Sequence, residues 1–459
     1  MKTFLLPPGV PDPPVRFRQA GRLELEYPET TPALADAVSA SLIGARPALL
    51  ELRTEAILRA IDDAVVEWSA PGSPACRAAE EGFTAATGIP GVTAPFLPLL
   101  NALRPPAIRD WVRQEVKPFG ALERFSPAED GAPVRAVGPR LAVHVLPGNV
   151  PLVWLPTLAA CLLMRTPCLV KPAADDPCTP ALFVASLAKR LPELAAALAV
   201  LPWDGGDTAV EESALERSSA VIVYGSDSTL RAVARRVPPD AKLLAHGPRY
   251  AVGAIGREMA SPGRIEAVAD AAARDALLYD GRGCLSLAAV YVERGGLLEP
   301  AETVAVLGRA MERASADLPP GKPDTETAAV TQSWRARIRA RALAGKPSAI
   351  FAGPRGLDWT VLYDAELAAP AVPLVRTLWV GAVGTLEEIP SRLAGCGGTV
   401  HALAFSGPEP RRLDLAERLA PAGLTRVCPF GRMQEPPLIW PHGGASPFKR
   451  LLDWARMER

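Results

Sequence analysis

The run Leu141-Ala-Val-His-Val-Leu146, the loop Pro147-Gly-Asn-Val150 and the apolar run from Pro151 to Arg165 decide the fold of this chain. The segment from Leu141 to Met164 contains no Asp, Glu, Lys or Arg, and it is long enough to cross a bilayer. Two prolines and a glycine interrupt the segment within its first half, and His144 adds a polar group. The pattern therefore predicts a buried strand, a tight loop and a buried helix inside an α/β core.

Strand-like and helix-like runs alternate on the C-terminal side of this unit. This alternation is typical of parallel βαβ units and predicts an α/β fold. In such sheets, ligands bind at the carboxyl ends of the strands, so the loops after Leu146, Lys171 and Tyr224 are the informative ones. No GxGxxG follows any predicted strand, so the usual dinucleotide fingerprint is absent. The strands are expected at Leu141–Leu146, Cys168–Lys171, Leu198–Pro202, Ala220–Tyr224 and Lys242–His246, and the helices at Pro151–Arg165, Pro180–Leu191, Thr208–Arg217 and Leu230–Val237.

The rest of the chain divides around this core. Residues 1–130 predict an N-terminal region of helices and irregular segments that packs on a cofactor-binding domain, residues 131–255. A second α/β domain, residues 256–428, carries Cys284, and residues 429–459 form a C-terminal loop and helix. The length of 459 residues fits two or three domains.

Composition excludes several classes of protein. The formal net charge is zero, so a nucleic-acid partner has no electrostatic support. The seven cysteines show no CxxC and no local Cys/His motif, and with only four histidines this argues against a metal site. An apolar start too short for a signal peptide, with scattered cysteines, predicts a cytoplasmic protein without membrane insertion.

The stretch Asp280-Gly-Arg-Gly-Cys-Leu-Ser286 carries the clearest chemistry. Glycines before Cys284 predict a turn on which the backbone approaches a ligand closely. Arg282, two residues away, would favour the thiolate, which is the nucleophilic form. The alternative is that Cys284 is a small buried side chain, as many free cysteines are, and these residues alone leave both interpretations open.

Five motifs, in order and at matching spacing, resemble the aldehyde dehydrogenase superfamily, and within it the lux-type acyl-CoA reductases. They span about 140 to 445, and each is weak alone. The motifs are Leu146-Pro-Gly-Asn-Val-Pro151, Leu169-Val-Lys-Pro172, Tyr224-Gly-Ser-Asp227, Tyr279-Asp-Gly-Arg-Gly-Cys-Leu-Ser286 and Cys428-Pro-Phe-Gly-Arg-Met-Gln434.

The resemblance implies a Rossmann-like cofactor domain, a catalytic domain that carries the nucleophile Cys284, and a homo-oligomer (a dimer or a tetramer). It implies that Asn149 donates to an oxyanion, that Lys171 contacts the adenosine ribose, and that Gly225 and Ser226 meet the pyrophosphate. Each residue also has a structural interpretation: Asn149 as a turn residue, Lys171 as a surface lysine and Ser226 as a helix cap.

The cofactor choice depends on the residue three positions after Lys171. The family has an acidic residue there that repels a 2′-phosphate, whereas this chain has Ala174. NADPH is therefore expected, with NADH possible because Asp175 and Asp176 follow. Pro147 and Ala174 complete the predicted cofactor site, and no metal is predicted.

Two departures from the family concern glutamates. The run Leu244-Ala-His-Gly247 lacks the carboxylate that activates water in ordinary aldehyde dehydrogenases. His246 is interpreted as a structural histidine, and the alternative is that it donates a hydrogen bond or relays a proton. The region Pro370–Pro373 lacks the second glutamate, which holds the nicotinamide ribose. His442 and Arg432 are further candidates for acyl or nucleotide contacts.

The sequence therefore predicts NAD(P)H-dependent reduction of an acyl thioester, acyl-CoA or acyl-carrier protein, to the aldehyde through a Cys284 acyl-enzyme. One alternative is an acylating aldehyde dehydrogenase that forms acyl-CoA. Another is a cofactor-independent cysteine acyltransferase or thioesterase, which would need a histidine base beside Cys284. A non-catalytic subunit is the third alternative.

Overall fold

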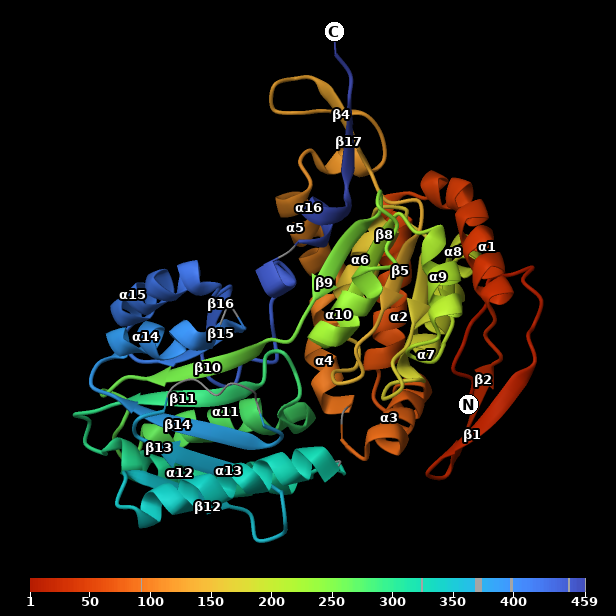
Figure 1. Cartoon of the computed structure of the whole chain (residues 1–459). Coiled ribbons are helices and arrows are strands. Elements are labelled where there is room, and N and C mark those ends of the chain that lie inside the picture. The colour runs from red at the N-terminus through yellow and green to blue at the C-terminus, as the bar shows by residue number, and fades with distance from the viewer. Residues whose placement is uncertain (92, 323–324, 368–373, 397–398, 445, 459) are drawn as a thin grey trace. The chain divides into compact units, whose positions relative to one another are not determined.

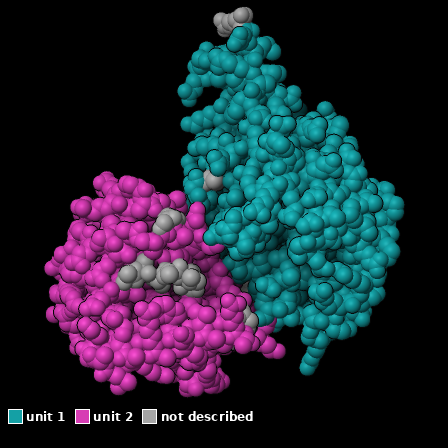
Figure 2. Space-filling model, in the orientation of Figure 1, with its two compact units in different colours: residues 1–87, 92–247, 437–459 teal, residues 88–91, 248–436 magenta. Residues whose placement is uncertain are grey.

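The chain folds into two compact units, shown in different colours in Figure 2. The computed structural model describes residues 1–91, 93–322, 325–367, 374–396, 399–444 and 446–458. The first unit comprises residues 1–87, 92–247 and 437–459, and the second comprises residues 88–91 and 248–436. The change of unit at 247/248 precedes the predicted boundary at 255/256, because the strand Tyr250–Ile255 pairs within the second unit.

A five-stranded parallel sheet forms the centre of the first unit (Figure 1). Its order is β7-β6-β5-β8-β9, so the order reverses at β5, as in doubly wound folds. The strands are β5 (Ala142–Val145), β6 (Cys168–Lys171), β7 (Leu198–Val200), β8 (Ala220–Tyr224) and β9 (Lys242–His246). The predicted strands were therefore correct in position, apart from the ends of the first and third.

Helices cover both faces of this sheet (Figure 1). The helix α1 (Pro32–Glu51) is long and apolar enough to cross a membrane, but its Ala35, Val38 and Leu42 are packed in the core of the unit. The others are α2 (Thr54–Ser69), α3 (Pro74–Thr87), α4 (Thr93–Ala102), α5 (Pro105–Glu115), α6 (Leu155–Leu163), α7 (Thr179–Ala188), α8 (Pro192–Ala197), α9 (Thr208–Glu216), α10 (Asp227–Ala234) and α16 (Pro447–Leu451). The segment Leu141–Met164 is thus a buried strand, a loop and a buried helix, as predicted.

Two small antiparallel sheets also belong to the first unit. The strands β1 (Val15–Ala20) and β2 (Leu23–Pro28) form a hairpin, which the sequence analysis missed. The alternation of apolar and charged residues in Val15-Arg-Phe-Arg18 was its signal. The second sheet has the order β17-β4-β3, from β3 (Ser126–Pro127), β4 (Pro133–Val137) and β17 (Asp453–Arg456). Residues 437–459 thus return to the first unit.

The second unit is a seven-stranded sheet in the order β12-β13-β14-β11-β10-β15-β16, with only β12 antiparallel to its neighbour. The central strands are β10 (Tyr250–Ile255), β11 (Leu287–Glu293) and β14 (Thr377–Val383). The others are β12 (Ser348–Ala352), β13 (Thr360–Asp364), β15 (Val400–Ser406) and β16 (Arg426–Cys428). The helices are α11 (Ile265–Leu277), α12 (Pro300–Asp317), α13 (Thr325–Leu343), α14 (Ile389–Leu393) and α15 (Glu409–Leu419).

Candidate active site

The predicted cofactor residues gather at the carboxyl edge of the five-stranded sheet. Pro147 and Asn149 lie on the loop after β5, Lys171 ends β6, and Gly225 follows β8. Because β5 and β8 are neighbours at the point where the strand order reverses, their loops flank the crevice in which such sheets bind ligands. The structure therefore brings these residues to one edge, whereas Cys284 belongs to the other unit.

The turn after β8 has the features of an anion site. Ser226 is the N-cap of α10, and its Oγ accepts the backbone N–H of Thr229 at 3.2 Å. A Cβ on Gly225 would lie 2.8 Å from Cγ2 of Thr229, so glycine allows the strand and helix to approach closely. The predicted cap is confirmed, and the first-turn N–H groups of α10 suit a pyrophosphate, although Asp227 adds a negative charge there.

Lys171 lines a pocket of about 80 Å³ beside β6. Its ammonium lies 5.5 Å from the centre of the Trp203 ring, and burial lowers its pKa. Ala174 also lines this pocket, together with Arg16 and Arg18 from the β1–β2 hairpin. Three cations therefore converge where the sequence predicted the adenosine ribose.

The two aspartates after Ala174, Asp175 and Asp176, are not among the residues that line the pocket at Lys171. Asp176 is buried, and its Oδ1 accepts the backbone N–H of Thr179 at the start of α7. A Cβ placed on Gly148 would lie 2.7 Å from the Cβ of Asp175, so Asp175 packs against the loop after β5. Burial raises the pKa of Asp176 to about 7, which favours its neutral form.

A column of aromatic rings stands at the ends of β8 and β9. Tyr224 and His246 stack at 4.4 Å between ring centres, and His246 and His442 stack at 4.7 Å. Trp440 extends the column at 5.3 Å from His442. This packing agrees with the structural interpretation of His246, and it shows what holds residues 437–444 against the sheet. Arg432 instead pairs with Glu435 in the second unit.

Cys284 lies just before the amino end of β11, where it is partly exposed. The preceding residues Tyr279, Asp280 and Gly281 all have positive φ, at 54°, 58° and 70°. Such backbone is costly for residues with a side chain and needs support from its surroundings. A Cβ on Gly281 would lie 2.8 Å from the carbonyl oxygen of Ala276, so only glycine fits there.

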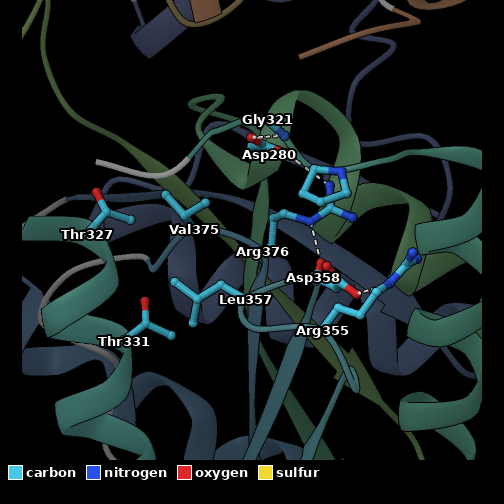
Figure 3. Close-up of a pocket in the computed structure, with 10 residues that line it drawn as sticks. Asp280, Gly321, Thr327, Thr331, Arg355, Leu357, Asp358, Val375 and Arg376 are labelled. Atoms are coloured by element: carbon cyan, nitrogen blue, oxygen red, sulfur yellow. Dashed lines mark hydrogen bonds and ion pairs between the residues drawn. The ribbon is translucent and has the colours of Figure 1, made fainter. Parts of the chain in front are cut away.

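A buried ion pair holds this loop from behind, next to a pocket of about 220 Å³ (Figure 3). Asp280 binds the guanidinium of Arg376 at 2.9 Å, and the two side chains are 3% and 2% exposed. The other Asp280 oxygen accepts the backbone N–H of Gly321 at 3.1 Å. Leu357 and Val375 also line the pocket. Any molecule in it would therefore lie against the ion pair that fixes the loop.

Residues of β15 and of the motif that ends at Gln434 also hold the loop through hydrogen bonds. The Nε2 of His401 lies 2.9 Å from the carbonyl oxygen of Cys284, and the pKa of His401 is lowered by burial to about 4. The neutral ring therefore donates its Nε2 proton to this carbonyl. Gln434 donates to the Oγ of Ser286, which itself accepts the backbone N–H of Gly283. The fifth sequence motif thus positions the cysteine loop.

Burial raises the pKa of the Cys284 thiol to about 11. The N–H groups of Cys284 and Leu285 and the cations Arg426 and Arg249 act in the opposite direction but do not outweigh it. This direction is opposite to the one that the sequence suggested from Arg282. The thiol is therefore neutral at pH 7.

Comparison with solved structures defines the fold. The salicylaldehyde dehydrogenase from Pseudomonas putida G7 superposes with a TM-score of 0.73 at 12% identity, covering 100% of this chain and 98% of that one. The predicted aldehyde dehydrogenase-like fold is confirmed. This likeness defines the fold, in which one unit carries the Cys284 loop and the other the doubly wound sheet.

The chain belongs to the acyl-CoA reductase (LuxC) family, whose model matches residues 49–454. A long-chain acyl-protein thioester reductase from Aliivibrio fischeri is 25% identical over 363 residues, which cover 77% of this chain and 71% of that protein. One from Photorhabdus laumondii is 23% identical over 363 residues, covering 76% and 70%. The predicted resemblance and the predicted reduction of an acyl thioester to the aldehyde are confirmed.

The roles of the individual site residues stay predictions. The region Pro370–Pro373, in which the sequence lacks the second glutamate of the family, lies outside the described residues. Sequence reasoning overlooked Arg16, Arg18 and Arg376, and it considered His401 only as an available base without assigning it a contact. Only the two arginines in the alternating run of β1 had a local signal, because the other two act through contacts with residues far away in the sequence.

Proposed function

We propose that Cys284 is the nucleophile of this acyl-thioester reductase. The observation that carries the proposal is the conformation of the loop from Tyr279 to Ser286. Its backbone is strained, and it is held by the buried Asp280–Arg376 ion pair and by hydrogen bonds from His401 and Gln434. Strain supported in this way clusters at functional sites. A buried cysteine that merely fills space needs no such support.

In the proposed reaction, the Cys284 sulfur loses its proton and bonds to the carbonyl carbon of the thioester, whose π electrons move to oxygen. The backbone N–H of Cys284 and the Asn149 amide donate to this oxyanion. The role of Asn149 rests on the motif match. The oxyanion then collapses, the carrier sulfur leaves as a thiolate and takes up a proton, and the acyl group stays on Cys284.

A reduced nicotinamide, when bound, supplies the hydride that reduces this acyl-enzyme. The residues that would hold the cofactor are Gly225 and Ser226 at the pyrophosphate and Lys171 at the adenosine ribose. The resulting hemithioacetal breaks its bond to sulfur, releases the aldehyde and returns Cys284. A long-chain acyl group, carried on CoA or on a carrier protein, is the proposed substrate, because the similar proteins are long-chain acyl-protein thioester reductases.

The acyl-enzyme is tested by mixing the protein with acyl-CoA in the absence of cofactor. Since the Leu244–Gly247 run has no carboxylate to activate water, about one CoA per active site is released before the reaction stalls. Intact mass shows the acyl adduct on the wild type and none on Cys284→Ala, and reduced cofactor discharges it as aldehyde. Continuous release of CoA and free acid favours a thioesterase instead.

NADPH is the proposed reductant, because the pocket at Lys171 offers cations to a 2′-phosphate. Arg16, Arg18 and Lys171 line it, with Ala174 at the position where an acid would repel the phosphate. Asp204 lies opposite as the partner of Arg16 at 3.2 Å, so a phosphate would compete with this carboxylate. Of the two aspartates that left NADH open, Asp176 is buried and accepts the backbone N–H of Thr179, and the Cβ of Asp175 packs against Gly148.

Dissociation constants for both cofactors test this choice. Arg18→Gln weakens NADPH binding about tenfold to a hundredfold, since a hydrogen bond to a charged group contributes about 1.5–3 kcal/mol, and leaves NADH unchanged. Arg22→Gln, in the turn of the same hairpin, is the matched control and changes neither constant. Tighter binding of NADH than of NADPH to the wild type would contradict the proposal.

A homo-oligomer is proposed through the small sheet β17-β4-β3. Trp454, Val137 and Met457 lie exposed on its strands or just beyond them, with Trp454 46% exposed. Exposed apolar groups on a narrow sheet favour association. Trp454→Glu is expected to lower the mass measured by sedimentation without unfolding the chain.

All seven cysteines are free thiols, which supports a reducing, cytoplasmic compartment.

A further inference from the structure

Three side chains that bind soft metals meet in the core of the first unit, away from the residues assigned to the reaction. His144 lies in β5, Cys161 in α6 and Cys168 at the start of β6. All three are 0% exposed. Their ligand atoms, one nitrogen and two sulfurs, lie within 4.8 Å of one another. Small movements of the side chains would bring them to the distances of a metal centre.

The topology explains why they meet. In the parallel pairing of β5 with β6, Ala142 faces Cys168 and His144 is two residues further on, so His144 and Cys168 point to the same face of the sheet. The helix α6 packs on that face and supplies Cys161. The turn that returns from α6 to β6 is fixed, because the backbone N–H of Thr166 donates to the Cys161 carbonyl at 2.9 Å.

Arg165 adds further constraint to this turn. Its φ is 55°, and its buried guanidinium donates to the carbonyl oxygens of Leu52 and Leu163 and to the hydroxyl of Thr54. The side chains of Cys161 and Cys168 therefore have little freedom to separate. A ligand set that is held in place before the ion binds loses little conformational entropy on binding.

A second observation is independent of the clustering. Among the described residues, neither ring nitrogen of His144 has a nitrogen or oxygen hydrogen-bond partner, although the ring is completely buried, and the polar group beside it is the Cys161 thiol. Burying a polar group without a partner is costly, so such groups in proteins are normally paired. A metal ion would satisfy one nitrogen of the ring and use the two adjacent sulfurs.

We propose that His144, Cys161 and Cys168 form a zinc site with three protein ligands in the cofactor-binding unit. Two thiolates, a neutral imidazole and Zn²⁺ sum to zero charge, which suits a core of apolar side chains. Binding would release the two thiol protons to solvent, with no change of oxidation state.

The site would fasten the three elements beneath the predicted cofactor loops. His144 is in the strand that leads to Pro147 and Asn149, and Cys168 is in the strand that ends at Lys171. The ligands are separated by 16 and six residues in the sequence, which matches no short metal motif. This spacing is why composition and motifs predicted no metal.

The test uses the full chain, purified without a histidine tag and under reducing conditions, with bound metals measured by inductively coupled plasma mass spectrometry. The expected result is about one zinc per chain for the wild type and for Cys178→Ala, and almost none for Cys161→Ala and Cys168→Ala. Cys178 is the matched control, because it is an equally buried free thiol of the same unit that is outside the cluster.

A second measurement keeps the proposal testable if the variants fold poorly. Cadmium added to the reduced, metal-depleted wild type is expected to give an ultraviolet thiolate-to-metal absorption band at a stoichiometry of one, and zinc is expected to raise the melting temperature. Absence of both zinc and the cadmium band would overturn the proposal, as would equal zinc contents in the wild type and in well-folded Cys161→Ala.

Discussion

The loop that carries Cys284 and the turn that carries Ser226 are held in place by opposite kinds of contact. Each presents backbone N–H groups next to a strand end. The turn after β8 is fixed by its own cap, with contacts no more than three residues apart. The Cys284 loop has two non-glycine residues with positive φ and depends on Arg376, His401 and Gln434, which are 92 to 150 residues away.

The difference follows from what each loop has to hold. A site that binds an anion needs only N–H groups in one direction, and the start of a helix provides them without strain. The nucleophile that we propose must be held in one direction relative to its acyl group, and distant side chains that make other conformations costly would hold its loop in this way. The comparison predicts that mutations of the residues that hold the Cys284 loop lower the free energy of unfolding far more than mutations in the Ser226 turn.

The largest effect is expected from Arg376→Ala. The change leaves the Asp280 carboxylate buried without its cation, which typically costs about 3–5 kcal/mol of stability. The control Arg313→Ala breaks the pair with Asp270, whose partners are 55% and 54% exposed, and costs less than about 1 kcal/mol. Denaturant unfolding of both variants makes the comparison. Equal losses would show that the loop does not depend on its buried ion pair.

Asn149→Ala examines the loop after β5, in the unit of the Ser226 turn. If the amide donates to the oxyanion, turnover falls about a hundredfold to a thousandfold, because loss of one such donor costs about 2.7–4 kcal/mol. Cofactor dissociation constants are expected to stay nearly the same. Steady-state kinetics and fluorescence titration measure the two quantities. Turnover close to that of the wild type would remove Asn149 from the mechanism.

Gly281→Ala examines the strain itself. A methyl group there would meet the Ala276 carbonyl oxygen and also require a positive φ, so a loss of about 2–3 kcal/mol is expected. Gly345 has a similar φ of +73° and no atom within 4 Å of a new Cβ. Gly345→Ala therefore costs only the backbone term, about 1 kcal/mol. The difference between their unfolding free energies measures the close contact, and no difference would refute it.

The raised pKa of Cys284 predicts a steep pH dependence for acylation. Since the folded-state pKa is about 11, the thiolate fraction increases about tenfold per pH unit over the neutral and mildly alkaline range. The initial burst of CoA release, measured without cofactor at several pH values, is expected to follow this slope. A plateau near pH 8 would mean that another group takes the proton from the thiol.

The smallest effect is expected from Ser226→Ala. The loss of one helix cap costs about 1 kcal/mol of stability, and because backbone N–H groups would still face the pyrophosphate, cofactor affinity changes little. Thermal unfolding and cofactor titration measure both values. A loss comparable with that of Arg376→Ala would end the distinction between the two loops.

The sequence alone determined the fold class, the first sheet and the family. Continuous apolar runs such as Ala220–Tyr224 indicate burial directly, and the motifs around Asn149, Lys171 and Cys284 depend on residue type and spacing within short segments. For the same reason the Ser226 cap was predictable, since a cap acts within one helical turn.

The tertiary structure decided what depends on long-range contact. Burial, and not the neighbouring Arg282, sets the direction of the Cys284 pKa, because desolvation is a property of the packed environment. The hairpin arginines reach Lys171, and His144 meets Cys161 and Cys168, only after the sheet has formed. Residues that have no local signal become neighbours through strand order, and a single sequence does not contain that order in any short segment.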